Sequence, residues 1–319
     1  MVNDASIGLA GLGYALPARK IPVEQLQDDG RLVSPAALLR SYGFEYCHVQ
    51  ESQEGVTELA LSSAKQAMSA SGHTADEISR VFLYSGVAAE AHLETGKTLE
   101  LFKYPVAELQ HRLNLSQANA IALSQQGCSG LLSVLEMARA LLSAPTSAPA
   151  QSILCVAADC LPRWSTREIL YNIVSDATAA VVVSGNCRRN RIVHFHQQVQ
   201  SYYWNTPLHE EELLASYFPI AQRVIEAALK GADLGLNDLR WIVPHNVSLR
   251  SWQILARILD FPMDRIWTQN IARVGHTVSC DHIINLVDME RSGAVQEGDY
   301  LLLFTFGFGA SWSALVIQH

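Results

Sequence analysis

The stretch Gln126-Gly127-Cys128-Ser129-Gly130 lies where an apolar, strand-like run ends and an amphipathic pattern begins. Apolar residues then recur at three- and four-residue spacing as far as Leu142, which predicts a helix that starts beside Cys128. The free N–H groups and the positive dipole end of a helix start stabilise an anion, so this position favours the thiolate form of a cysteine. A free cysteine is also common as a small core residue. The junction therefore predicts an α/β protein in which Cys128 is a candidate nucleophile.

The composition is that of an ordinary globular protein: 319 residues, 49% hydrophobic, with a formal net charge of -8. A chain of this length can bury a large core, as one domain or as two fused halves. The acidic balance argues against non-specific nucleic-acid binding, and no apolar run is long enough to cross a membrane. The six cysteines are scattered and match no metal-ligand spacing. We therefore expect a cytoplasmic protein with no metal site, no nucleic-acid partner and no membrane span.

The order of the expected elements repeats along the chain. A helix over 56–71 leads to a strand over 81–84, and a helix over 213–230 leads in the same way to a strand over 241–243. Further strands are expected over 153–158, 179–183 and 301–306, and irregular connections over 145–149 and 187–209. This alternation favours two similar α/β halves whose sheets are covered on both faces.

The glycine-rich stretch Gly8–Gly13 is not interpreted as a phosphate-binding loop. Pro17 and Pro22 follow it where a dinucleotide-binding helix would have to run.

Two histidines occupy positions like that of Cys128. His245 follows the expected strand over 241–243, and His276 follows Gly275 just before an apolar helix pattern. Side chains at such junctions can converge at the carboxyl edge of one sheet, although two independent surface turns would give the same pattern. His276 and His282 have no third candidate ligand for a metal.

Four motifs resemble, in order and spacing, those of the ketoacyl-acyl-carrier-protein synthase III family of the thiolase superfamily. The motifs are Gln126-Gly127-Cys128-Ser129-Gly130, Val243-Pro244-His245, Gly275-His276-Thr277 and the glycine-rich end Gly307–Ala314. The resemblance covers nearly the whole chain and implies a thiolase-like five-layered α/β/α/β/α sandwich. It implies an N-terminal half (1–190) that carries the nucleophilic cysteine, a C-terminal half (191–319) that carries the two histidines, a homodimer, and no cofactor.

The resemblance also implies roles for these residues. Cys128 would be the acylated nucleophile, His245 would bind and polarise the second thioester, and the backbone N–H groups of Cys128 and Gly309 would form the oxyanion hole. The family usually has asparagine where this chain has His276. An imidazole can exchange a proton, whereas an amide can only hydrogen-bond. Two histidines also occur in the decarboxylating cysteine enzymes of chain elongation, so condensation and simple acyl transfer both remain open.

The donor implied by the resemblance is a thioester of acyl carrier protein or coenzyme A. Ala37 and Ser41 stand where members primed by coenzyme A have a tryptophan and an arginine. Arg250 stands where the family has a basic residue that docks the carrier at the mouth, so we expect a carrier-protein donor. Ser248 and Tyr104 are further candidates for substrate binding.

The sequence thus predicts an acyl-thioester-dependent acyltransferase or condensing enzyme of fatty-acid, polyketide or other specialised metabolism. The alternative is a non-catalytic partner subunit of a heteromeric synthase. Such partners typically lack the nucleophile, and Cys128 is present.

Overall fold

The computed structural model describes residues 6–50, 53–87, 98–144 and 152–319. The connection expected over 145–149 lies outside this range. None of the helices in the described part of the chain is both long and apolar enough to cross a membrane.

The backbone is organised around a sheet with nine strands, made of two sets that meet edge to edge. The strands of the first set, in spatial order, are β5 (Asn119–Ser124), β4 (Ile78–Ser85), β6 (Ser152–Asp159), β9 (Ala177–Ser184) and β1 (Gly8–Ala15). Those of the second set are β10 (Arg191–Val199), β13 (Ser311–Gln318), β12 (Tyr300–Gly307) and β11 (Leu239–Pro244). The two sets join through one pair of residues, Gly8 and Arg191.

The second set repeats the strand directions of the first. From β1 outward the pairings are antiparallel with β9, antiparallel between β9 and β6, and parallel between β6, β4 and β5. From β10 outward they are antiparallel with β13, antiparallel between β13 and β12, and parallel between β12 and β11. At the position equivalent to β5, the second set has only an isolated parallel bridge between Ile242 and Ile266.

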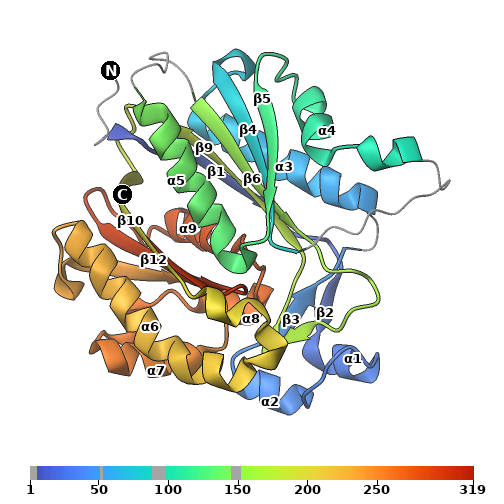
Figure 1. The fold of residues 1–319 in the computed structure, drawn as a ribbon, viewed down its shortest axis with the longest axis vertical. Helices are drawn as coiled ribbons and strands as arrows, with labels where there is room; N and C mark the ends of the chain where they lie inside the picture. The colour runs from blue at the N-terminus through green and yellow to red at the C-terminus, as the bar shows by residue number, and fades with distance from the viewer. Residues whose placement is uncertain (1–5, 51–52, 88–97, 145–151) are drawn as a thin grey trace.

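Helices cover both sets and also separate them (Figure 1). The longer helices are α3 (Gln53–Ser71), α4 (Pro105–Arg112), α5 (Gly130–Ser143), α6 (Glu210–Gly231), α7 (Leu249–Leu259) and α9 (Asp281–Ser292). The α3 and α4 helices cover the outer face of the first set, and α6 covers that of the second with α7 beside it. The α5 helix contacts both β6 and β13, and α9 contacts both β1 and β11, so these two form the middle layer. The architecture is the expected five-layered α/β/α/β/α sandwich.

Shorter elements lie around this frame. They are α1 (Val23–Asp28), α2 (Ala36–Ser41), α8 (Gln269–Val274) and two small two-stranded sheets, β2 (Lys20–Pro22) with β3 (Tyr46–His48) and β7 (Glu168–Ile169) with β8 (Asn172–Ile173).

The apolar residues of each strand divide between two cores because successive side chains of a strand point to opposite faces. In β6, Ile153 and Cys155 face the middle core that α5 and α9 fill, whereas Leu154 and Val156 face the outer core beneath α3. A strand buried on both faces has a continuous apolar run, which is why 153–158 was predictable as a strand.

The glycines at the start of the chain have a packing role. Gly11 and Gly13 lie in β1, where an added Cβ would come within 2.2 Å of the Ala67 carbonyl oxygen and 2.4 Å of the Ser63 carbonyl oxygen. These carbonyls belong to α3, so the glycines let the helix contact the strand backbone directly. The stretch thus forms part of strand β1.

The expected strands and helices named above are all present, with ends shifted by a few residues. The expectation of an irregular connection over 187–209 was wrong in part, because β10 occupies 191–199. Most of its residues are only half-buried, and polar side chains such as His194 and Gln197 interrupt the apolar pattern that reveals the other strands.

Candidate active site

Cys128 lies in a sharp turn between β5 and α5, as the sequence predicts. Gln125 and Gly127 both have left-handed backbone conformations, with φ of 73° and 50°. Cys128 is in a short 3-10 turn that leads directly into Gly130, the first residue of α5. The side chain is 6% exposed. The turn thus places the thiol at a helix start, next to a cavity.

Neighbouring elements hold this turn in place through backbone contacts. The Tyr84 hydroxyl donates to the Gly127 carbonyl at 2.7 Å and accepts the Gln126 N–H at 3.2 Å. Its ring lies against Gly130, where an added Cβ would come within 1.9 Å of the ring. From the other half, Gly307 approaches so closely that a Cβ would meet the Gln126 carbonyl oxygen at 2.3 Å. The cysteine turn therefore depends on both halves of the molecule.

His276 faces Cys128, with its Nε2 3.2 Å from the cysteine Sγ. Its backbone is fixed on both sides, because its N–H donates to the Ile173 carbonyl and its carbonyl accepts the Ser175 N–H, both at 2.8 Å. The preceding Gly275 has φ of 77°, the left-handed region that favours glycine. The imidazole is therefore held at a fixed place beside the thiol.

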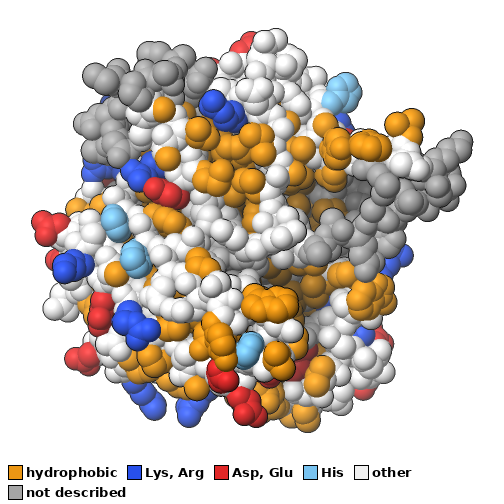
Figure 2. Space-filling model, viewed as in Figure 1, with side chains coloured by type: hydrophobic (Ala, Val, Ile, Leu, Met, Phe, Trp, Pro, Cys, Tyr) orange, Lys and Arg blue, Asp and Glu red, His pale blue; other side chains and the backbone are white. Residues whose placement is uncertain are grey.

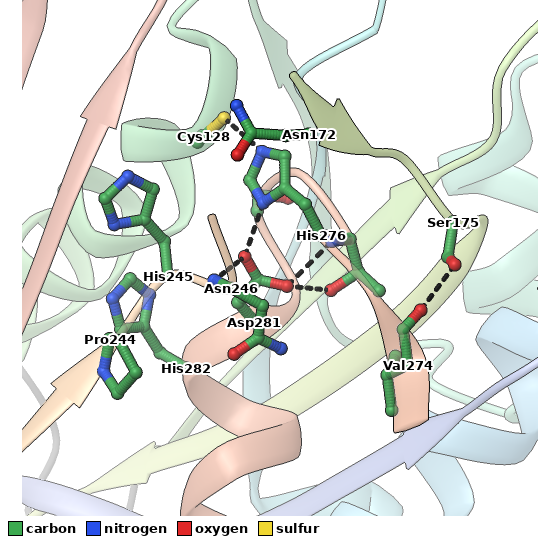
Figure 3. A network of polar contacts seen from close by, with 12 residues as sticks. Cys128, Asn172, Ser175, Pro244, His245, Asn246, Val274, His276, Asp281 and His282 are labelled. Carbon is green, nitrogen blue, oxygen red and sulfur yellow. Dashed lines mark hydrogen bonds and ion pairs between the residues drawn. The ribbon is translucent and has the colours of Figure 1, made fainter. Parts of the chain in front are cut away.

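Asp281 completes this arrangement. Its Oδ2 accepts His276 Nδ1 at 2.6 Å and the Asn246 N–H at 2.7 Å, and its Oδ1 accepts the N–H and hydroxyl of Thr277 at 2.7 and 2.6 Å. Figure 3 shows His276 between Cys128 and Asp281, with His245 beside them.

The electrostatics of the site favour a charged His276. Burial alone would lower the pKa of His276, but the charges of Cys128 and Asp281 outweigh it and hold that pKa well above 6.5. Burial likewise pushes the pKa of Asp281 up, but the charge of His276 and the four hydrogen bonds to the carboxylate lower it overall. The Asp281 carboxylate thus stabilises a positive charge on the imidazole that faces Cys128.

His245 lies at the end of β11, as the sequence predicts, with its ring centroid 6.0 Å from that of His276. Its Nδ1 lies 3.2 Å from the Phe304 carbonyl oxygen, and His282 Nε2 lies 3.0 Å from the same oxygen. The backbone N–H of His245 also donates to this carbonyl, at 3.3 Å. Burial and then the charge of His276 lower the pKa of His245 to about 3, so its ring is neutral.

Two cavities meet at Cys128 and His276. The first, here called the aromatic cavity, has a volume of about 150 Å³ and is lined by Cys128, His245 and His276 together with apolar side chains. Its apolar lining includes Leu170, Leu214, Tyr217, Phe218, Phe306 and Phe308. The second, of about 290 Å³, includes Gly127, Val278 and Gly309 and shares Cys128, Ile169, His276 and Phe308 with the first. A group bound to the thiol can thus extend into one space while a second molecule enters the other.

Of the other predicted site residues, some line the cavities at Cys128 and some do not. Gly309 lines the second cavity with Cys128, and its oxyanion-hole role stays a prediction. Arg250 is exposed on α7, next to Ser251, which lines the aromatic cavity. Ser248 is buried and caps α7 by accepting the Ser251 N–H at 3.2 Å. Tyr104 is 56% exposed at the start of α4 and lines neither cavity.

Sequence reasoning missed Asp281 and Tyr84. Asp281 is the first residue of α9, where an acidic residue is already expected for the helix dipole, so its position gave no distinct signal. Tyr84 looked like one more apolar residue of a strand. Within the described residues, no group of three or more His, Cys, Asp or Glu side chains is placed to hold a metal ion.

Comparison with known proteins finds similarity to 3-oxoacyl-acyl-carrier-protein synthases III. Residues 229–319 match the family described as 3-Oxoacyl-[acyl-carrier-protein (ACP)] synthase III C terminal. The chain is 25% identical over 338 residues to the Beta-ketoacyl-[acyl-carrier-protein] synthase III of Xanthomonas campestris pv. campestris (strain 8004), covering 98% of each chain.

Two solved structures share the fold over almost the whole length. The 3-oxoacyl-(acyl carrier protein) synthase III of Pseudomonas aeruginosa PAO1 superposes with a TM-score of 0.82 at 22% identity, covering 98% of both chains. The acyltransferase ChlB3 superposes with a TM-score of 0.83 at 22% identity, covering 98% of this chain and 97% of that one. The chain therefore resembles 3-oxoacyl-acyl-carrier-protein synthases III over nearly its whole length and shares their fold, and its last 91 residues match the C-terminal family model of these enzymes.

Proposed function

We propose that the protein is an acyl-thioester-dependent acyltransferase that forms an acyl-enzyme on Cys128. The observation that carries this proposal is the contact of 3.2 Å between Cys128 Sγ and His276 Nε2, with Asp281 at 2.6 Å from the other ring nitrogen. A nucleophile, a base and a group that orients the base, all within hydrogen-bond reach, are the parts that nucleophilic catalysis needs.

The first half-reaction follows from this geometry. The Cys128 thiolate attacks the carbonyl carbon of the donor thioester, and a new C–S bond forms. As the bond to the donor sulfur breaks, His276 Nε2 gives its proton to the departing thiolate, which leaves as a thiol. Asp281 stabilises the imidazolium before this step and keeps the proton on Nδ1 throughout, so the proton that moves is the one on Nε2.

The donor in this proposal is an acyl carrier protein. The chain segment after α2 meets the start of α7, because the Leu249 N–H donates to the Tyr42 carbonyl at 2.8 Å. Ala37 and Ser41, which replace the nucleotide-binding pair, are exposed near this junction, and Arg250 is exposed on α7. Arg250 can attract an acidic carrier protein by its charge, whereas Ala37 offers no aromatic ring on which an adenine could stack.

A homodimer is part of the same proposal. Within the described residues, β5 pairs with β4 on one side only, and its Ile121 is 44% exposed. Figure 2 shows hydrophobic side chains gathered over α5 and β5, where Met137 is also exposed. An unpaired strand edge with apolar side chains beside it favours pairing with a second copy.

The alternatives to an acyltransferase are a non-catalytic partner subunit and a condensing enzyme. A partner subunit without catalysis has no use for the fixed contact between Cys128, His276 and Asp281, so the geometry favours an enzyme. Condensation and acyl transfer share the acyl-enzyme, and both kinds of protein are represented among proteins of this fold, as the synthase from Pseudomonas and the acyltransferase ChlB3 illustrate.

Intact-protein mass spectrometry tests the acyl-enzyme. We expect a mass gain of one acyl group after incubation with acyl carrier thioesters, located on Cys128 by peptide mapping. Cys128→Ala should abolish the gain, whereas Cys187→Ala, which removes a half-buried thiol from another part of the fold, should retain it. A mass gain that survives Cys128→Ala, or no gain with any thioester, refutes the proposal.

A further inference from the structure

The hydrogen bond of His245 fixes which of its ring nitrogens carries the proton. A carbonyl oxygen can only accept, so the Nδ1 that faces the Phe304 carbonyl at 3.2 Å must be an N–H. The ring is neutral, because burial and the nearby charge of His276 lower its pKa to about 3. A neutral imidazole has one N–H, so Nε2 of His245 carries a lone pair. His245 lines the aromatic cavity, and no hydrogen bond to its Nε2 is found within the described part of the chain.

Once Cys128 is acylated, His276 is also a neutral imidazole with its proton on Nδ1. The Asp281 carboxylate can only accept, so Nδ1 of His276 carries a proton at all stages. The proton on Nε2 leaves with the donor thiol. In the acyl-enzyme, both His245 and His276 therefore present a lone pair at Nε2.

The two Nε2 lone pairs determine which kind of second substrate can react with the acyl-enzyme. Decarboxylation of a malonyl thioester places negative charge on its carbonyl oxygen, and this charge is stabilised by N–H donors directed at it. Two lone pairs would repel that oxygen instead. A nucleophile that brings its own proton on oxygen or nitrogen has the opposite requirement, since it needs an acceptor for that proton.

From this arrangement, and resting on the proposed acyl-enzyme, we infer that the second substrate is a protic nucleophile, an amine or a hydroxyl compound, and that the enzyme does not form a carbon–carbon bond by decarboxylation. The apolar and aromatic lining of the aromatic cavity indicates that the reacting group is borne on an apolar body.

The second half-reaction then balances as follows. The nitrogen or oxygen of the acceptor attacks the acyl carbon, a C–N or C–O bond forms, and its proton passes to His276 Nε2. The C–S bond breaks, and Cys128 leaves as a thiolate beside the imidazolium that has just formed, which restores the resting state. His245, with its low pKa, stays neutral and acts as a positioning residue whose Nε2 accepts a hydrogen bond from the second N–H of an amine acceptor. A hydroxyl acceptor has a single proton, which goes to His276.

The experiment uses the full-length protein with acyl-Cys128 formed from an acyl carrier thioester and measured by mass. Three arms follow: a malonyl carrier thioester labelled at its free carboxyl, aniline, and benzyl alcohol. We expect aniline or benzyl alcohol to discharge the acyl group roughly tenfold or more faster than water does, with formation of the amide or ester and no labelled CO₂. The faster of the two arms identifies an amine or a hydroxyl acceptor.

Release of labelled CO₂ coupled to a 3-oxoacyl product overturns the inference while leaving the acyl-enzyme intact, and so does a failure of both protic probes to outpace water. Absence of acyl-Cys128 is a separate readout that refutes the proposed function itself.

A pair of variants tests the role of His245. His245→Ala should raise the KM for the acceptor severalfold while the rate of Cys128 acylation stays the same. His282→Gln is the matched control, because His282 bonds the same Phe304 carbonyl but does not line the aromatic cavity. If both variants change the acceptor KM equally, His245 has only a structural role.

Discussion

Replacing Asp281 with asparagine tests the orientation of His276 most directly. The carboxylate accepts four hydrogen bonds, two on each oxygen. An asparagine keeps one oxygen, so either Thr277 or the pair of His276 and the Asn246 N–H would face an amide NH₂ instead. With the NH₂ toward His276, the proton on Nδ1 must move to Nε2, and the imidazole can no longer accept a proton at the position next to Cys128.

The size of the effect follows from these contacts. In the general template of a nucleophile, histidine and aspartate, the wrong histidine tautomer lowers kcat by about 10⁴, and general-base catalysis alone supplies about 10² to 10⁴. We therefore expect Asp281→Asn to slow Cys128 acylation by about 10³ to 10⁴, equivalent to ~4 to 5 kcal/mol. The loss of two charged hydrogen bonds should also lower the free energy of unfolding by ~3 kcal/mol.

Rapid-quench mass spectrometry measures the acylation rate, and urea unfolding measures the stability. Asp288→Asn is the matched control on the same helix, since Asp288 also accepts several hydrogen bonds, from Arg273, Tyr14 and Asn270, but lines neither of the two cavities at Cys128. Acylation by Asp281→Asn within tenfold of the wild-type rate would refute the argument that Asp281 sets the tautomer of His276.

Further predictions concern the reactivity of Cys128, the role of His276, the recognition of the donor by Arg250, and the stability of the fold in acid. Iodoacetamide at neutral pH should label Cys128 before any other cysteine, because burial raises the pKa of the other five thiols; peptide mapping with another thiol labelled first would contradict this. His276→Asn should leave Cys128 acylation detectable by mass but change the pH dependence of turnover, and an unchanged profile would reduce His276 to a hydrogen-bonding group. Arg250→Glu and added salt should each lower kcat/KM for an acyl carrier protein severalfold, and a preference for the matching coenzyme A thioester would count against a carrier donor. The pKa values of about 3 for His245 and about 4 for His282 lie below the unfolded value of 6.5, so the unfolded state binds more protons between these values and stability must fall as the pH falls. Each histidine should contribute a loss of ~2 to 3 kcal/mol between pH 7 and pH 4.5, and equal urea midpoints at the two pH values would exclude this.

The sequence was informative about Cys128 and His245 because each follows a strand and precedes an apolar helix. Such junctions lie at one edge of a sheet, so the convergence of Cys128 and His245 on one cavity could be anticipated. The expectation of the same kind of junction at His276 was wrong, because His276 follows helix α8 and forms only an isolated bridge with Val174. The two-fold organisation was visible for a related reason, since α3 with β4 and α6 with β11 carry similar patterns.

The electrostatic surroundings of His276 and His245 could not be anticipated in the same way. Asp281 has the residue type that any helix start favours, and the proton on His245 is set by a backbone carbonyl, whose position the side-chain sequence does not encode. The role of Tyr84 depends on Gly127 and Gly130, which approach it only when β4 and the cysteine turn are packed together. Sequence motifs therefore indicate which side chains come together. The tautomer and protonation state of these side chains depend on contacts with backbone groups that are far away in the sequence.

The incomplete repeat of the sheet has a consequence for assembly. The first half ends in a full edge strand, β5, but at the matching place the second half offers only the bridge between Ile242 and Ile266. A molecule with two adhesive edges could pair head to tail without end and grow into a filament. The other edge strand, β11, is partly covered, because the Trp267 N–H donates to its Ile242 carbonyl at 3.1 Å. In the proposed homodimer, β5 pairs with β5 of another copy, and this pairing is self-complementary. The incomplete repeat therefore leaves β5 as the more open of the two sheet edges, which favours a closed pair of molecules over an open filament.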